Sequence, residues 1–112
     1  YHDAVRKYFL LGASDTARLP ERIRIFNKVG MAYGYLVDCA YIVDYEVGVE
    51  FFVSAVLRVD SPVPGPSAAG YNWSKGLYFF RELGWALYRY ETTRKRPRHP
   101  DLSSLKYAYK HR

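Results

Sequence analysis

The chain has 112 residues, of which 49% are hydrophobic and 25% are charged, enough for one domain with a single core. The ordinary charged fraction argues against a wholly disordered chain. The formal net charge of +6 is concentrated near the end, where residues 94–112 set only Asp101 against a series of Lys and Arg side chains. We therefore expect one domain over residues 1–96 and a basic tail over residues 97–112.

The composition gives no support for disulfide, metal or membrane-spanning functions. The single cysteine, Cys39, cannot form an internal disulfide, and its apolar neighbours predict a buried, inert thiol. His2, His99 and His111 lie near the two ends without the spacing of metal ligands. No apolar run is long enough to span a bilayer. We expect no cofactor, no metal and no transmembrane segment.

The first elements in chain order are a helix and a strand. Residues 1–12 place apolar side chains at helical spacing and end on Gly12, which predicts the last turns of a helix. After a loop, residues 22–28 alternate in the way a strand does. One face of this strand carries Ile23, Ile25 and Asn27, and the other carries Arg24, Phe26 and Lys28.

Two further strands follow after short turns. Residues 35–45 have an apolar face that starts at Tyr35, whereas Asp38 and Asp44 interrupt the opposite face. Residues 49–59 alternate in the same way. Three consecutive strands with tight turns predict an antiparallel meander, and its apolar faces need a cover.

Residues 71–94 provide that cover, because apolar side chains recur there at spacings of three and four, with Asn72 or Ser74 as the candidate N-cap. Pro97 and Pro100 end the pattern. The predicted fold class is α+β: a three-stranded antiparallel sheet covered by a long C-terminal helix, with the N-terminal helix alongside.

The segment around Lys28 carries the most specific pattern. A strand ends in Asn-Lys-Val-Gly, and a Tyr-Gly turn, two strands and a helix follow. The stretches "IRIFNKVGMAYGYLVDCAYIVDYEVGVEFFVSAVLRV" and "FFRELGWALYRYETTRKRPRHPDL" resemble the closing segment of serine β-lactamases and penicillin-binding proteins. They are most similar to the β-lactamase-like serine hydrolases of bacteria. That superfamily has a Lys-Thr/Ser-Gly signature in this strand, and Lys28, Val29 and Gly30 take its place.

The resemblance implies a partial β-lactamase/transpeptidase-like fold, action on an amide or ester, and an extracytoplasmic location. It makes Lys28 catalytic and assigns substrate contacts to Asn27, Val29, Gly30 and Tyr33. A cation beside a nucleophile lowers the cost of developing negative charge. Glycine lets a peptide-like substrate lie against the strand as an added strand. Val29 departs from the family, because it lacks the hydroxyl that binds a substrate carboxylate.

The Ser-x-x-Lys nucleophile motif of that superfamily is missing. Only Ser103 has a lysine three positions later, Lys106, and this pair lies in the polar tail. These residues therefore hold no nucleophile–base pair for serine hydrolysis. We expect the chain to be the C-terminal part of a hydrolase, inactive alone and completed by a missing N-terminal part of the same protein.

Other interpretations stay open. A turn centred near Ala32 would place Lys28 opposite Leu36 and diagonal to Asp38, as an ordinary cross-strand ion pair. The same fold without a nucleophile would serve as a non-catalytic peptide- or glycan-binding module, which Val29 favours. The basic tail suggests attraction to nucleic acid or anionic lipid, although no aromatic residues are interleaved with its charges. An unpaired sheet edge also favours dimers.

Overall fold

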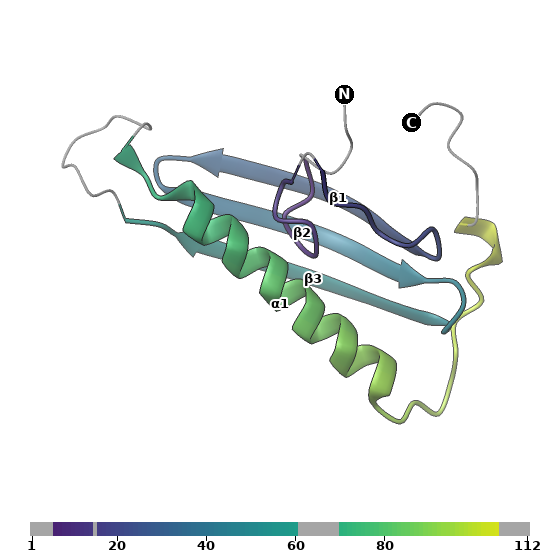
Figure 1. The fold of residues 1–112 in the computed structure, drawn as a ribbon. Coiled ribbons are helices and arrows are strands. Elements are labelled where there is room, and N and C mark those ends of the chain that lie inside the picture. Colours follow the sequence, from purple (N-terminus) through teal and green to yellow (C-terminus); the bar gives the residue numbers. More distant parts are fainter. Residues whose placement is uncertain (1–5, 15, 61–69, 106–112) are drawn as a thin grey trace.

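The computed structural model describes residues 6–14, 16–60 and 70–105. They form β1 (Ile23–Ala32), β2 (Tyr35–Asp44), β3 (Val49–Arg58) and α1 (Trp73–Thr93), followed by a short 3-10 helix at Ser103–Leu105. The strands make one antiparallel sheet in the order β1-β2-β3, and α1 crosses one face of it diagonally (Figure 1). The predicted α+β class and the three-stranded meander are confirmed.

A two-residue turn joins β1 to β2. Tyr33 and Gly34 have positive φ angles of 52° and 85°, which is the conformation of a type I′ turn, whose twist matches that of the flanking strands. Ala32 therefore pairs with Tyr35, and the pairing continues without interruption along both strands.

This register places Lys28 opposite Cys39. The prediction that Lys28 lies opposite Leu36 is wrong, because the turn follows Ala32 and is not centred on it. The observed partner of Lys28 is an odd number of residues away from the predicted one. Lys28 and Asp38 therefore lie on opposite faces of the sheet. The cross-strand ion pair considered for Lys28 does not form.

The side chain of Asp44 organises the turn between β2 and β3. Its Oδ1 accepts hydrogen bonds from Glu46 N and Val47 N, each at 3.0 Å. Gly48 closes the turn with a φ of 73° and donates its N–H to the Asp44 carbonyl oxygen at 3.0 Å. Asp44 then pairs with Val49, which sets the β2–β3 register.

Helix α1 begins at a polar cap and packs through small and aromatic residues. Of the two candidate caps, Asn72 is the one used: its Oδ1 accepts from Lys75 N at 3.3 Å. The buried side of the helix repeats every four residues, at Gly76, Phe80, Gly84 and Tyr88. The helix thus presents one narrow stripe to the rest of the molecule.

We call the side of the sheet under α1 the covered face, and the other side the open face. The covered face of β2 carries Leu36, Asp38, Ala40, Ile42 and Asp44, all of them buried. The prediction that the face starting at Tyr35 is the covered one is wrong. The register set by the turns decides the outcome, and hydrogen bonds allow both aspartates to be buried.

The open face carries the alternate side chains of the strands. It comprises Arg24, Phe26, Lys28 and Gly30 of β1, Tyr35, Val37, Cys39, Tyr41 and Val43 of β2, and Glu50, Phe52, Ser54, Val56 and Arg58 of β3. Cys39 is exposed there, so the prediction of a buried thiol is wrong for the same reason.

The predicted N-terminal helix is not formed by the described residues. Residues 1–5 lie outside them, and Leu10, Gly12 and Ala13 all have positive φ angles, which excludes an α-helix. The apolar residues that suggested a helix, Tyr8 to Leu11, are instead buried against α1 and the sheet. We call residues 8–11 the N-terminal plug.

Two contacts explain the shape of the N-terminal plug. Asp38 Oδ2 accepts hydrogen bonds from Tyr8 N and Phe9 N, at 3.1 and 3.3 Å. These two N–H groups therefore bind a side chain of the sheet. Leu10 O accepts from Trp85 Nε1 at 3.0 Å. A side chain at Gly84 would place its Cβ 2.6 Å from Leu10 N, so glycine is needed for the close approach of α1.

The segment after α1 lies against the β2–β3 turn. Arg96 Nη1 donates to Gly48 O at 2.9 Å, and Tyr45 OH donates to Leu105 O at 2.6 Å. Leu102, which lies between Arg96 and Leu105 in the sequence, is buried. The first part of the predicted tail is thus packed on the domain, whereas residues 106–112 lie outside the described residues.

Candidate functional site

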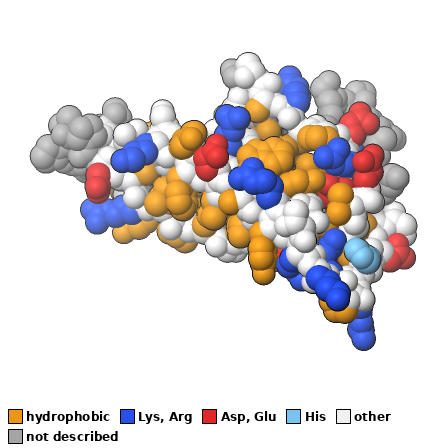
Figure 2. All heavy atoms as spheres, turned by 60° about the horizontal axis from the view of Figure 1, so that its bottom comes forward, with side chains coloured by type: hydrophobic (Ala, Val, Ile, Leu, Met, Phe, Trp, Pro, Cys, Tyr) orange, Lys and Arg blue, Asp and Glu red, His pale blue; other side chains and the backbone are white. Residues whose placement is uncertain are grey.

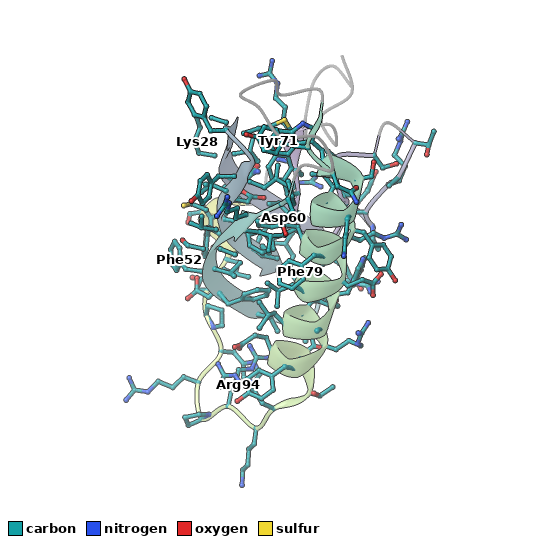
Figure 3. All side chains as sticks on the ribbon, turned by 90° about the vertical axis from the view of Figure 1, so that its left-hand side faces the viewer. Lys28, Phe52, Asp60, Tyr71, Phe79 and Arg94 are labelled. Atoms are coloured by element: carbon teal, nitrogen blue, oxygen red, sulfur yellow. The ribbon has the colours of Figure 1, made fainter. Side chains whose placement is uncertain are left out.

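Lys28 lies on the open face, in the second half of β1. Cys39 of β2 is its direct neighbour, and Ser54 of β3 follows in the same row. Figure 3 shows Lys28 and Phe52 on the side of the sheet away from α1. The Lys28 side chain is exposed, and its Nζ donates to Val29 O at 2.6 Å. The ammonium is therefore at the surface, held at the edge of its own strand.

The backbone of β1 has an outer edge, since among the described residues this strand pairs only with β2. Tyr45 N donates to Arg22 O at 2.9 Å, and backbone groups alternate in direction along a strand. The N–H and C=O groups of even-numbered β1 residues therefore point to β2, and those of Val29 and Met31 point outward. The Nζ atom of Lys28 donates its hydrogen bond to one of these outward carbonyl oxygens, that of Val29.

Gly30 stands beside Lys28 on the open face. A Cβ atom built there would meet only Val37 Cβ, at 3.8 Å, an ordinary contact. The backbone of Gly30 has no positive φ angle. Neither packing nor backbone conformation requires glycine here, so the absence of a side chain leaves open surface next to the lysine.

The other predicted site residues lie elsewhere. Asn27 and Val29 are on the covered face, and Val29 packs partly against the hydrophobic core. Tyr33 is in the turn, 80% exposed. The structure therefore brings Lys28 and Gly30 together on one face and separates them from the remaining three.

Asn27 belongs to a polar cluster with Lys7 and Asp38. Its Oδ1 accepts from Lys7 Nζ at 3.0 Å, and its Nδ2 donates to Asp38 Oδ1 at 3.0 Å and to Arg6 O at 2.9 Å. Burial of the Asp38 carboxylate raises its pKa, because the hydrogen bonds from Asn27 and the two plug N–H groups and the charge of Lys7 only partly offset desolvation. The cluster ties residues 6–9 to the sheet.

The open face also carries an aromatic row that the sequence reasoning missed. Phe26, Tyr41 and Phe52 lie side by side across the three strands, with ring centroids 6.1 and 4.5 Å apart in stacked arrangements. Tyr41 OH donates to the Glu50 carboxylate. Burial, and then this carboxylate, raise the pKa of Tyr41 to about 12.

A signal for the aromatic row existed in the sequence. Strand β3 carries apolar residues on both faces, with Phe51 and Val53 on one and Phe52 and Val56 on the other. A strand of that kind predicts a sheet that is buried on both sides. In the structure, Phe52 is 81% exposed.

Within residues 6–14, 16–60 and 70–105, no group of His, Cys, Asp and Glu side chains is arranged to hold a metal ion. The same stretches contain no helix with the length and apolarity needed to cross a membrane. Comparison with models of protein families, with curated proteins and with solved structures finds no match.

Proposed function

We propose that the chain is the sheet-and-helix part of a β-lactamase-like serine hydrolase that acts on an amide or ester, with Lys28 as its electrostatic stabiliser. The observation that carries the proposal is the pairing of Lys28 with Gly30 on the face that α1 leaves open. A lysine beside a glycine that packing does not require is the arrangement expected where another molecule approaches the strand.

The edge of β1 supports a substrate position. A peptide-like substrate added along this edge would hydrogen-bond the outward backbone groups of Val29 and Met31. It would compete with Lys28 Nζ for the Val29 carbonyl oxygen. The released ammonium would then be available to a developing negative charge on the substrate. The nucleophile would come from outside these residues, on an element facing the open side of the sheet.

Labelling with an acylating serine probe tests the proposal. The protein is produced together with its upstream sequence, where a Ser-x-x-Lys motif opening a helix is expected. Lys28→Ala should slow labelling by about 10²–10³-fold, since the positive charge at the reacting centre is lost. Lys75→Ala, at an exposed position of α1, is the matched control. Equal labelling of the Lys28→Ala protein would overturn the assigned role.

The aromatic row favours a second function, that of a non-catalytic peptide- or glycan-binding module. Exposed aromatic rings offer a flat apolar surface with a polar rim, and Phe52 presents most of its ring to solvent. An upstream sequence without a Ser-x-x-Lys motif would favour this function. A panel of peptides and oligosaccharides titrated against the wild type and Phe52→Ala then shows whether the row binds them.

A further inference from the structure

The second edge of the sheet is formed by β3. Among the described residues, this strand pairs only with β2. Val59 N donates to Gly34 O at 2.7 Å, so the odd-numbered residues of β3 direct their backbone groups to β2. The even-numbered residues therefore direct theirs outward, which gives a regular row of donors and acceptors from Glu50 to Arg58.

Two of the features that usually prevent strand pairing, proline and bulges, are missing from this edge. The ten residues Val49–Arg58 contain no proline, and their pairing with β2 has no bulge. Phe52 and Val56 are 81% and 67% exposed on the open face of β3. Figure 2 views the molecule from below and from the α1 side, where hydrophobic side chains also reach the surface between charged ones.

We propose that two copies of the chain pair through β3, antiparallel, with a two-fold axis at Ser54, to give a continuous six-stranded sheet. In this register Glu50 of each copy faces Arg58 of the other copy, and Phe52 faces Val56. In an antiparallel pair, the numbers of two facing residues always add up to the same value. Ser54 of one copy therefore faces Ser54 of the other copy. The even-numbered residues carry the outward backbone groups, and in this register they pair with one another, as an antiparallel ladder requires.

Charge complementarity selects this register. Glu50 and Arg58 are the only charged residues of β3, and both are exposed on the open face. Pairing about Ser54 makes two opposite-charge pairs, one on each side of the axis, and each such cross-strand pair is favourable. A shift to pairing about Val53 would place Glu50 opposite Val56 and lose both pairs. The strand is thus complementary to itself in one alignment.

The pairing also covers apolar surface that the single copy leaves exposed. Phe52 of each copy contacts Val56 of the other on the open face, and aromatic–β-branched pairs are among the favourable cross-strand pairs. Glu50 keeps one carboxylate oxygen for Tyr41 OH and offers the other to Arg58 of the second copy. The inference is independent of the proposed hydrolase, since it uses β3 and not β1.

Sedimentation equilibrium of the 112-residue chain is the first test. We expect a monomer–dimer equilibrium between about 10 µM and about 500 µM, because mass action favours the dimer with rising concentration. A chain that stays monomeric at the upper concentration overturns the proposal.

Charge reversal tests the register. Arg58→Glu and Glu50→Arg should each weaken self-association about tenfold, because each makes two like-charge pairs across the axis. An equimolar mixture of the two variants should dimerise again, because every pair in the heterodimer is of opposite charge. Arg24→Glu, which changes the same charge on the open face of β1, is the matched control. Dimers that respond alike to Arg58→Glu and Arg24→Glu would overturn the register.

A proline separates edge pairing from folding. Ser54 directs its N–H outward, so Ser54→Pro removes a donor of the free edge and leaves the β2–β3 ladder bonds in place. This variant should be monomeric, with a thermal unfolding transition close to that of the wild type measured at low concentration. A Ser54→Pro protein that folds and still dimerises shows that another surface associates and overturns the edge proposal.

Discussion

Asp38 and Asp44 are buried on the same face of β2, and their surroundings shift their pKa values in opposite directions. Desolvation dominates at Asp38, whose pKa is raised. At Asp44 desolvation is again the largest single effect, but hydrogen bonds from Tyr88 OH, two turn N–H groups and Arg22 outweigh it together, and its pKa is lowered. Tyr88 OH donates to Asp44 Oδ2 at 2.5 Å, and Arg22 Nε at 3.2 Å.

The sign of the pH dependence follows from these directions. Asp44 binds its proton less tightly in the folded state, so its contribution to stability is complete above its ordinary pKa and is lost as pH falls through the folded-state value. Asp38 binds its proton more tightly in the folded state. Its contribution is complete below its ordinary pKa and is lost as pH rises through the folded-state value.

Asp44→Asn should lower the free energy of unfolding by about 1–3 kcal/mol at neutral pH. The variant removes the charged acceptor of the Tyr88 hydroxyl and the turn N–H groups, whereas the half-exposed Arg22 adds little because solvent screens its ion pair. The difference from the wild type should narrow at about pH 3, where the wild type loses the same contribution. Urea unfolding at the two pH values measures it. Asp60→Asn, at an exposed carboxylate, is the control, and a difference that is the same at both pH values would contradict the assignment.

At the scale of elements, the position of α1 depends on its glycines. Gly76 lets the helix approach β2, since a Cβ there would lie 2.5 Å from Leu36 Cδ1. Gly84 allows the same close approach to the N-terminal plug, where the nearest atom to an added Cβ would be the backbone nitrogen of Leu10. Side-chain atoms can move aside more cheaply than a backbone held by hydrogen bonds to Asp38 and Trp85.

Gly84→Ala should therefore destabilise the protein by about 1–3 kcal/mol, the cost of overpacking, although alanine is the better helix former by about 1 kcal/mol. Ala86→Gly, at an exposed position in the same turn, measures the propensity difference separately. Thermal unfolding of both variants provides the comparison. A gain in stability for Gly84→Ala equal to the loss for Ala86→Gly would show that the helix has room at this position.

The three strands and α1 could be predicted from the sequence, because alternation and helical spacing are local properties. The same spacing in residues 1–12 predicted a helix that the described residues do not form. The register could not, since it depended on locating the turn at Tyr33 and Gly34 beyond Ala32, and the error placed Lys28 and Asp38 on the same face of the sheet. The buried aspartates were also beyond reach. Tyr8 lies 30 positions from Asp38, and Tyr88 lies 44 positions from Asp44, so no local pattern reveals these partners.

At the scale of the whole molecule, the segment after α1 contributes to the fold. It returns along the β2–β3 turn in Figure 1, and Leu102 is only 7% exposed. The basic residues of this segment are thus attached to the sheet at one end of the strands. Residues 96–105 are held against the β2–β3 turn through the hydrogen bonds of Arg96 and Leu105.

Leu102→Ala should lower the free energy of unfolding by about 2 kcal/mol, because a buried side chain is truncated. Arg98→Ala, at an exposed position of the same segment, should change it by less than about 0.5 kcal/mol. Urea denaturation at a concentration where the chain is monomeric distinguishes the two. Equal, small effects would mean that the segment adds nothing to stability.

The burial of the N-terminal plug beneath α1 determines the order in which the protein can be completed during synthesis. The Trp85 side chain contacts Leu10, 75 positions earlier in the sequence, so this contact must wait until α1 has been translated. The β1–β2 and β2–β3 hairpins can form before this contact, because closing a short loop costs little entropy. Asp38 remains hydrated until the plug returns to it. The N-terminal plug precedes the strands in the chain, yet it is among the last of these segments to be buried.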